Sequence, residues 1–123
     1  MKKIKLSNSE KILMDVLWEK NRAFMRDIID VYPEPKPAAT TIATLLKRMQ
    51  NKNLIGFELK GNLREYYPKI AKGDYFKEEM TSMIDRFFNS SVTQFASFFT
   101  SNNKLTQKEL KELRDIIDKE IND

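Results

Sequence analysis

Apolar side chains recur at helical spacing in the first third of the chain. One stripe predicts a helix over about residues 7–20, and Ser7 with Glu10 has the spacing of a capping box at its start. A second stripe predicts a short helix that ends at Pro33, because the proline ring removes a backbone donor and cannot continue a helix. The members of this second stripe are Met25, Ile28, Ile29 and Tyr32. Two helices therefore precede the proline-rich connector at residues 33–37.

A third helix is predicted after this connector, over residues 38–52, because two contrasting faces appear there at helical spacing. The apolar face, which we expect to be buried, consists of Ile42, Leu45, Leu46 and Met49. The opposite face has neither apolar nor acidic side chains and consists of Thr40, Thr44, Lys47 and Asn51. This polar face is the first candidate for a binding surface.

Residues 54–70 change from a helical to an alternating period. From Phe57 on, apolar and charged side chains alternate, and Gly61-Asn62 follows as a pair that tolerates positive φ. Pro68 lacks a backbone donor and predicts the end of an edge strand. We therefore expect a two-stranded hairpin over residues 57–67, with a basic tip.

Only helices are predicted beyond residue 72. A wide apolar stripe covers about residues 74–89, a Phe-rich cluster covers 92–99, and a polar break follows at 100–103. Thr106 and Glu109 have the spacing of another capping box, which starts the last helix. The order of elements indicates a mainly α protein with a small β-hairpin wing. We expect a winged helix-turn-helix domain in residues 1–71 and a helical dimerisation lobe in residues 72–123.

The chain of 123 residues contains no cysteine and no histidine. Disulfides, thiolate or imidazole metal sites, and catalytic triads or dyads built on these residues are therefore excluded. No two acids are spaced to flank an apolar pocket, so we expect neither an enzyme nor a bound metal or cofactor. Neither a signal-peptide core nor a run of about 20 apolar residues occurs, so we expect no membrane insertion and a cytoplasmic location.

Positive charge concentrates in the first part of the chain. Residues 1–70 carry 14 Lys/Arg and 8 Asp/Glu, whereas residues 71–123 carry 8 and 10. A basic lobe with a polar helix and a basic hairpin tip suits the phosphates and base edges of double-stranded DNA. The candidate DNA contacts are Thr40, Thr41, Thr44, Lys47, Arg48 and Asn51 on the helix, and Lys60, Asn62 and Arg64 on the wing.

Two other interpretations of the basic surface stay open at this point. Lys47, Arg48 and Lys52 are also compatible with an ordinary solvated helix face. A winged-helix module that binds an acidic protein partner, with no specific DNA site, would need the same charges.

The second part of the chain is rich in phenylalanine. Of the 8 phenylalanines, 6 lie between residues 76 and 99, and so short a segment cannot bury that many aromatic faces against itself. This favours a homodimer, which would present two third helices about 34 Å apart, one turn of DNA. The alternative is that these side chains pack onto the winged lobe. The candidate dimer contacts are Phe76, Met80, Met83, Phe87, Phe88, Phe95, Phe99, Leu113 and Ile117.

Four groups of short motifs lie in order along nearly the full chain. They are Leu6-Ser7 with Glu10 and Met14 through Leu17-Trp18; Thr41-Ile42 with Thr44-Leu45-Leu46 and Arg48-Met49 through Lys52; Arg64 with Tyr66-Tyr67-Pro68; and Leu105-Thr106 with Glu109 and Leu113-Arg114. In this order and spacing they resemble the BlaI/MecI family of penicillinase and methicillin-resistance repressors.

The resemblance implies a dimeric transcriptional repressor that binds a palindromic operator through its winged lobes and dimerises through its C-terminal helices. It also implies a membrane-bound, antibiotic-sensing protease, or its cytoplasmic effector, as the partner that triggers cleavage in the dimerisation lobe. The Asn-Phe dipeptide cut in relatives is absent, and the matching region is 94–99, so a cut is expected here without a defined site. The cysteines of the copper-responsive branch are absent, and Ala43 stands where some relatives have a basic residue.

Overall fold

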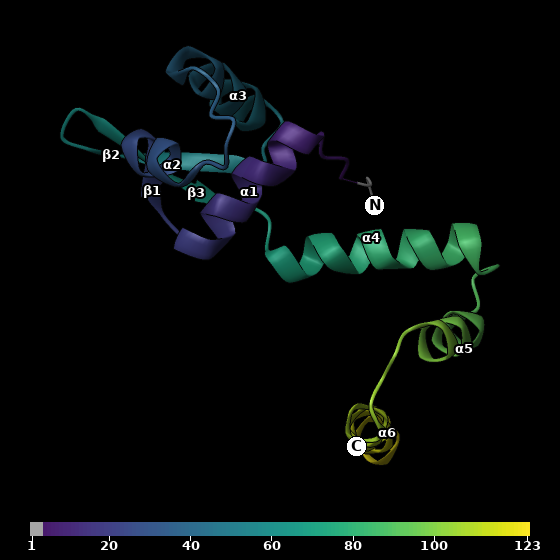
Figure 1. Cartoon of the computed structure of the whole chain (residues 1–123). Coiled ribbons are helices and arrows are strands. Elements are labelled where there is room, and N and C mark those ends of the chain that lie inside the picture. The colour runs from purple at the N-terminus through teal and green to yellow at the C-terminus, as the bar shows by residue number, and fades with distance from the viewer. Residues whose placement is uncertain (1–3) are drawn as a thin grey trace. The chain divides into compact units, whose positions relative to one another are not determined.

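The structure, a computed structural model, describes residues 4–123. Its residues form two units, one up to Glu78 and the other from Glu79 to Asp123 (Figure 1). The boundary between the units lies inside a helix, whereas the domain boundary expected from the sequence, between residues 71 and 72, coincides with the start of that helix.

Three helices open the first unit, and all three were predicted from apolar periodicity. They are α1 (Asn8–Lys20), α2 (Met25–Val31) and α3 (Ala39–Asn51). The predicted capping box is present at α1, where the Ser7 hydroxyl accepts from the Glu10 amide and the Glu10 carboxylate accepts from the Ser7 amide. The second helix ends before Pro33, as expected from the restricted backbone of the residue preceding a proline.

The sheet has three strands, and the prediction of a two-stranded hairpin was incomplete. Strands β2 (Ile55–Lys60) and β3 (Leu63–Pro68) form the predicted hairpin, and β1 (Ala23–Phe24) pairs with β3 on its other side. A two-residue strand is too short to show an alternating pattern, so the sequence carried no signal for it. Gly61 turns the hairpin with a φ of +63°.

The expectation that Pro68 belongs to an edge strand was wrong, because β3 is the central strand. Pro68 nevertheless lies at the last position of β3, opposite Ile55 and beyond the two residues that pair with β1. Its missing N–H therefore removes no hydrogen bond from the pairing with β1.

The core of the first unit lies between the three helices and the sheet. It includes all four residues of the predicted apolar face of α3, so that face is confirmed. Leu13, Leu17 and Ile28 contribute from the other two helices, and Ile55 and Tyr66 from the sheet. The outer face of α3 is held in place by this packing of its inner face.

Three further helices follow: α4 (Lys72–Phe87), α5 (Val92–Asn102) and α6 (Gln107–Asn122). The predicted capping box at Thr106 and Glu109 is present at the start of α6. The polar break predicted at residues 100–103 was wrong in extent, because α5 continues to Asn102. The Thr100 hydroxyl donates to the Ala96 carbonyl inside the helix, so its polar group is satisfied without ending it.

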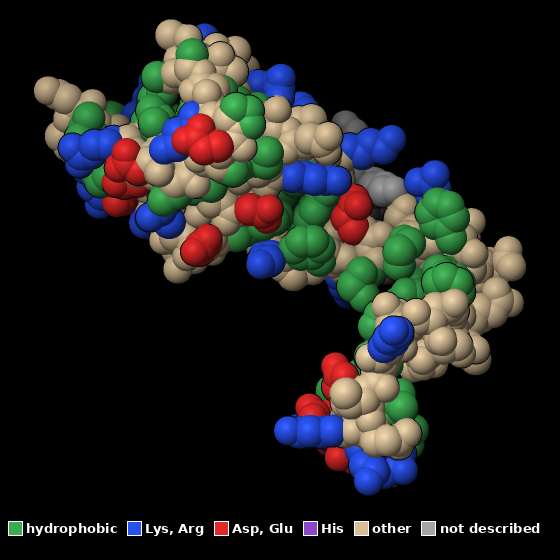
Figure 2. Space-filling model, viewed as in Figure 1, with side chains coloured by type: hydrophobic (Ala, Val, Ile, Leu, Met, Phe, Trp, Pro, Cys, Tyr) green, Lys and Arg blue, Asp and Glu red, His purple; other side chains and the backbone are tan. Residues whose placement is uncertain are grey.

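Large apolar side chains remain exposed in the second unit, and none of its residues, all of which are described, is buried. Figure 2 shows apolar side chains at the surface of this part of the chain. Rings of Phe88 and Phe95 are 5.5 Å apart and form a small aromatic cluster with Phe98 and Phe99. The most exposed apolar residues of the unit are Phe87, Val92, Ile116, Ile117 and Ile121. The unit therefore does not cover its own apolar surface.

Candidate nucleic-acid interface

The six candidate DNA contacts on the third helix are all exposed on α3. Because Leu45, Leu46 and Met49 are buried on the opposite side, the helix presents this polar face outward. The Thr44 hydroxyl is already engaged within the helix. Its Oγ1 donates to the Thr40 carbonyl at 3.0 Å, which leaves the Thr44 methyl group and an acceptor lone pair for a ligand.

The three candidate residues on the wing are exposed near the hairpin turn. The Lys60 ammonium is 3.7 Å from the Glu58 carboxylate, and the Arg64 guanidinium lies 4.3 Å above the centre of the Phe57 ring. In the part of the chain that the structure describes, no carboxylate forms an ion pair with Arg64. Its charge is thus oriented by an aromatic ring and available to an anion.

Arg22 forms ion pairs with both strands of the wing, a role that the sequence did not indicate. Glu58 and Glu65 lie directly opposite each other on β2 and β3, and Arg22 is 2.9 Å from the first and 3.3 Å from the second. Two carboxylates at this register repel each other, and the arginine between them offsets the repulsion. The hydrogen bond from Arg22 lowers the pKa of Glu58.

Glu10 is a buried carboxylate that joins α1 to α3. Beyond its predicted capping role, it accepts from the Lys52 ammonium at 2.9 Å and pairs with the Arg48 Nε at 3.5 Å. Burial alone raises the pKa of Glu10, but the Ser7 amide and Lys52 together outweigh it, so the pKa is lower than its usual value of 4.5. The sequence showed the cap but not these partners, because they lie about 40 residues away.

The stability contributed by the charge of Glu10 is expected to depend on pH. Its folded-state pKa is depressed, so the contribution is present above the unfolded value of 4.5 and is lost as the pH falls through the folded value. The difference in unfolding free energy between the wild type and Glu10→Gln should therefore be largest near neutral pH and shrink below about pH 4.5. Urea unfolding at a series of pH values measures it, and a difference that grows on acidification would contradict the assignment.

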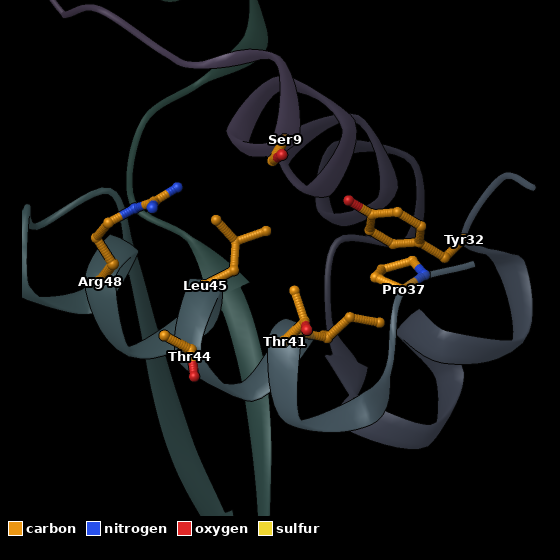
Figure 3. Close-up of a pocket in the computed structure, with 8 residues that line it drawn as sticks. Ser9, Tyr32, Pro37, Thr41, Thr44, Leu45 and Arg48 are labelled. Carbon is orange, nitrogen blue, oxygen red and sulfur yellow. The ribbon is translucent and has the colours of Figure 1, made fainter. Parts of the chain in front are cut away.

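A hollow of about 290 Å³ lies between the start of α1, the end of α2 and one side of α3 (Figure 3). Three of the predicted residues, Thr41, Thr44 and Arg48, line it from α3. Its other lining residues are Ser9, Tyr32, Pro37, Ile42 and Leu45. Ser9, Tyr32 and Pro37 were missed as site residues because they come from separate segments with no shared motif.

The candidate site contains no group of acidic side chains that could hold a metal ion within residues 4–123. Over the same residues, no helix combines the length and apolar character that a membrane span requires. The surface groups available for binding are hydroxyls, amides and cations, which suit an anionic, hydrogen-bonding partner.

Three helices followed by a hairpin, with a basic and hydroxyl-rich face on the third helix, define a winged helix-turn-helix protein. A model of the family described as "Penicillinase repressor" matches residues 6–119. The chain belongs to this penicillinase repressor family, which confirms the resemblance that the short motifs indicated. The family consists of DNA-binding transcriptional repressors rather than enzymes, so those two predictions are confirmed.

Similar proteins span nearly the whole chain. A penicillinase repressor of Bacillus licheniformis is 27% identical over 124 aligned residues, which cover 99% of this chain and 97% of the relative. The methicillin resistance regulatory protein MecI of Staphylococcus aureus (strain N315) is 25% identical over 119, covering 96% and 97%. A solved structure titled "CopR Repressor Structure" is 31% identical and covers 55% of this chain and 99% of that chain, with a TM-score of 0.47.

Proposed function

We propose that this repressor is a homodimer that binds a specific palindromic operator in double-stranded DNA. In this proposal α3 lies in the major groove and the wing contacts the phosphate backbone. The observation that carries it is the outer face of α3, where every side chain of Thr40, Thr44, Lys47 and Asn51 is exposed and none is acidic or apolar. Hydroxyl, amide and ammonium groups on one helix face can contact base edges and phosphates at the same time.

The second unit supports the homodimer. Its apolar side chains, among them Met80, Phe87 and Ile117, are 51%, 68% and 57% exposed, which is unfavourable in an isolated chain. A second copy offers the same apolar faces and can cover them by two-fold symmetry.

Phe76 is a different case. It belongs to the first unit, where its ring centre is 6.0 Å from that of Trp18, although 42% of it remains exposed.

The proposal also includes release of the operator by proteolysis in the second unit. The stretch expected from the resemblance, residues 94–99, lies within α5. A cut there would separate α6 from α4, so a dimer whose interface includes both helices would be weakened. The triggering partner in this proposal is a membrane-bound sensor protease or its cytoplasmic effector, and the repressor acts on DNA in the cytoplasm.

Paired substitutions on α3 test which side chains contact phosphates and which read bases. Lys47→Ala should weaken binding to all duplexes alike and reduce the slope of log K against log salt by about 0.9 per lost contact. Thr44→Ala should leave the salt slope unchanged and lower the affinity for the operator relative to other duplexes by about 1 kcal/mol. Fluorescence anisotropy with operator and scrambled duplexes at several salt concentrations measures both effects.

The matched control for the charge is Lys111→Ala, which removes one ammonium from α6 in the second unit. It should leave both the salt slope and the sequence preference close to those of the wild type. If the wild type prefers no DNA upstream of its own operon, or prefers an acidic protein to duplex DNA, the chain is instead an assembly module.

A further inference from the structure

Tyr32 is a nearly buried residue whose hydroxyl reaches the hollow beside α3. The residue is only 7% exposed, and within residues 4–123 its Oη forms no hydrogen bond to another residue. Figure 3 shows the ring lying against Pro37 and the hydroxyl directed into the hollow. A phenol is protonated at neutral pH, and burial raises the pKa of Tyr32 further above it. It therefore offers one hydrogen-bond donor to whatever enters the hollow.

A cation lies on the other side of the same hollow. Arg48 lines it from α3 and is half exposed, and in Figure 3 its guanidinium points toward the space below Ser9. The nearby Glu10 carboxylate does not cancel this charge, because Lys52 also pairs with it at 2.9 Å and leaves one positive charge in excess. The pairing engages the Arg48 Nε, so the two terminal nitrogens remain available.

The remaining lining suits a small tetrahedral anion. Exposed Ser9 and Thr41 contribute hydroxyls to the lining, and buried Ile42 and Leu45 contribute apolar surface. Several neutral donors around one arginine match a phosphate group, which has several acceptor oxygens and a delocalised negative charge. Thr41 and Arg48 are also among the candidate DNA contacts on α3, beside the outer face that we propose lies on DNA.

We infer that this hollow binds one phosphodiester of the DNA backbone, with the Tyr32 hydroxyl donating to a phosphate oxygen and Arg48 supplying the charge. This inference rests on the proposed function. Contacts to phosphates position a protein on the duplex, so a phosphate held between α1, α2 and α3 would set the register of α3 on the bases. Tyr32 is then a positioning residue for sequence recognition although it touches no base.

The first test compares Tyr32→Phe with the wild type. The variant keeps the ring and loses only the hydroxyl, and we expect operator affinity to fall about tenfold for each of the two subunits, as for a hydrogen bond to a charged group. The salt slope should not change, because a phenol releases no counterion, whereas Arg48→Ala should reduce it by about 0.9 for each of the two hollows of the dimer. Tyr75→Phe is the control, since it removes a hydroxyl from a buried tyrosine that packs on Trp18 and should leave affinity unchanged.

The second test identifies the phosphate. Operator duplexes that carry a single neutral methylphosphonate at successive positions are titrated with the wild type and with Tyr32→Phe. At the phosphate held in the hollow, the two changes should be non-additive, because either one removes the same hydrogen bond. Additive losses at every position would overturn the inference and make Tyr32 a purely structural residue, and so would unchanged affinity of the variant.

A third arm separates DNA from a free phosphate as the source of the anion. Replacing chloride by inorganic phosphate at constant ionic strength should weaken DNA binding by the wild type at least as much as by Tyr32→Phe, because free phosphate competes with the DNA phosphate for the hollow. Stronger operator binding in phosphate, seen with the wild type and absent from Tyr32→Phe, would assign the hollow to a free phosphate and overturn the assignment to DNA. If the wild type itself shows no operator preference, the proposed function fails first, and the inference falls with it.

Discussion

Replacing Ile117 by aspartate is expected to convert the proposed dimer to a monomer and to lower operator affinity by at least about 100-fold. Ile117 is on α6 and is 57% exposed within its own unit, so a second copy is the surface that we propose covers it. A carboxylate at that contact would have to be desolvated without a partner, which costs more than the contact contributes. A monomer also loses the gain from binding two half-sites at once, which is typically 100-fold or more.

Sedimentation equilibrium and operator titrations of the same samples measure the two effects of Ile117→Asp. Lys119→Gln is the matched control, because it makes the same change of one unit in net charge at an exposed position on the same helix. It should remain a dimer and keep its affinity. A fully dimeric Ile117→Asp with normal operator binding would move the interface away from α6.

Replacing Glu10 by alanine is expected to lower the free energy of unfolding by about 3 kcal/mol. The substitution removes the cap at the Ser7 amide and leaves a small cavity in a fully buried place. It also leaves Arg48 and Lys52 without their partner. Because both cations are about half exposed, water can solvate them, and the loss stays at the lower end for a broken buried pair.

Urea unfolding of Glu10→Ala is compared with that of Glu19→Ala, which removes an exposed carboxylate from the same helix. The control should change the unfolding free energy by no more than about 0.5 kcal/mol. An equal, small effect of both substitutions would show that the pairing of Glu10 with α3 contributes nothing measurable to stability.

Glu10 also helps to arrange the binding surface, because it pairs with two of its cations. The carboxylate orients Arg48 through its Nε and holds Lys52 at the end of α3, so part of the basic surface is fixed before DNA arrives. A side chain already held in place loses less conformational entropy on binding. Because Arg48 and Lys52 are paired with Glu10, they are less free to neutralise phosphates. Among the cations of α3, Lys47 is the one that forms no ion pair within residues 4–123.

Local patterns predicted the elements and the faces of this protein well. The capping boxes at Ser7 and Thr106 were correct because both partners are three residues apart and need no tertiary context. The apolar face of α3 was correct because burial of a helix stripe leaves a clear period in the sequence. The end of α5 was predicted too early, since Thr and Asn side chains can bond to their own helix as well as end it.

The sequence by itself determined the order of the elements, the outward face of α3 and the apolar excess of the second unit, because these properties follow from residues close together in the chain. Only the tertiary structure decided that β1 joins β3, that Glu10 pairs with Arg48, and that Tyr32 shares a hollow with that arginine. Each of these arrangements brings together residues that are separated by at least 16 positions in the chain. No periodic pattern encodes such pairs, because their distance is set by how the whole core packs.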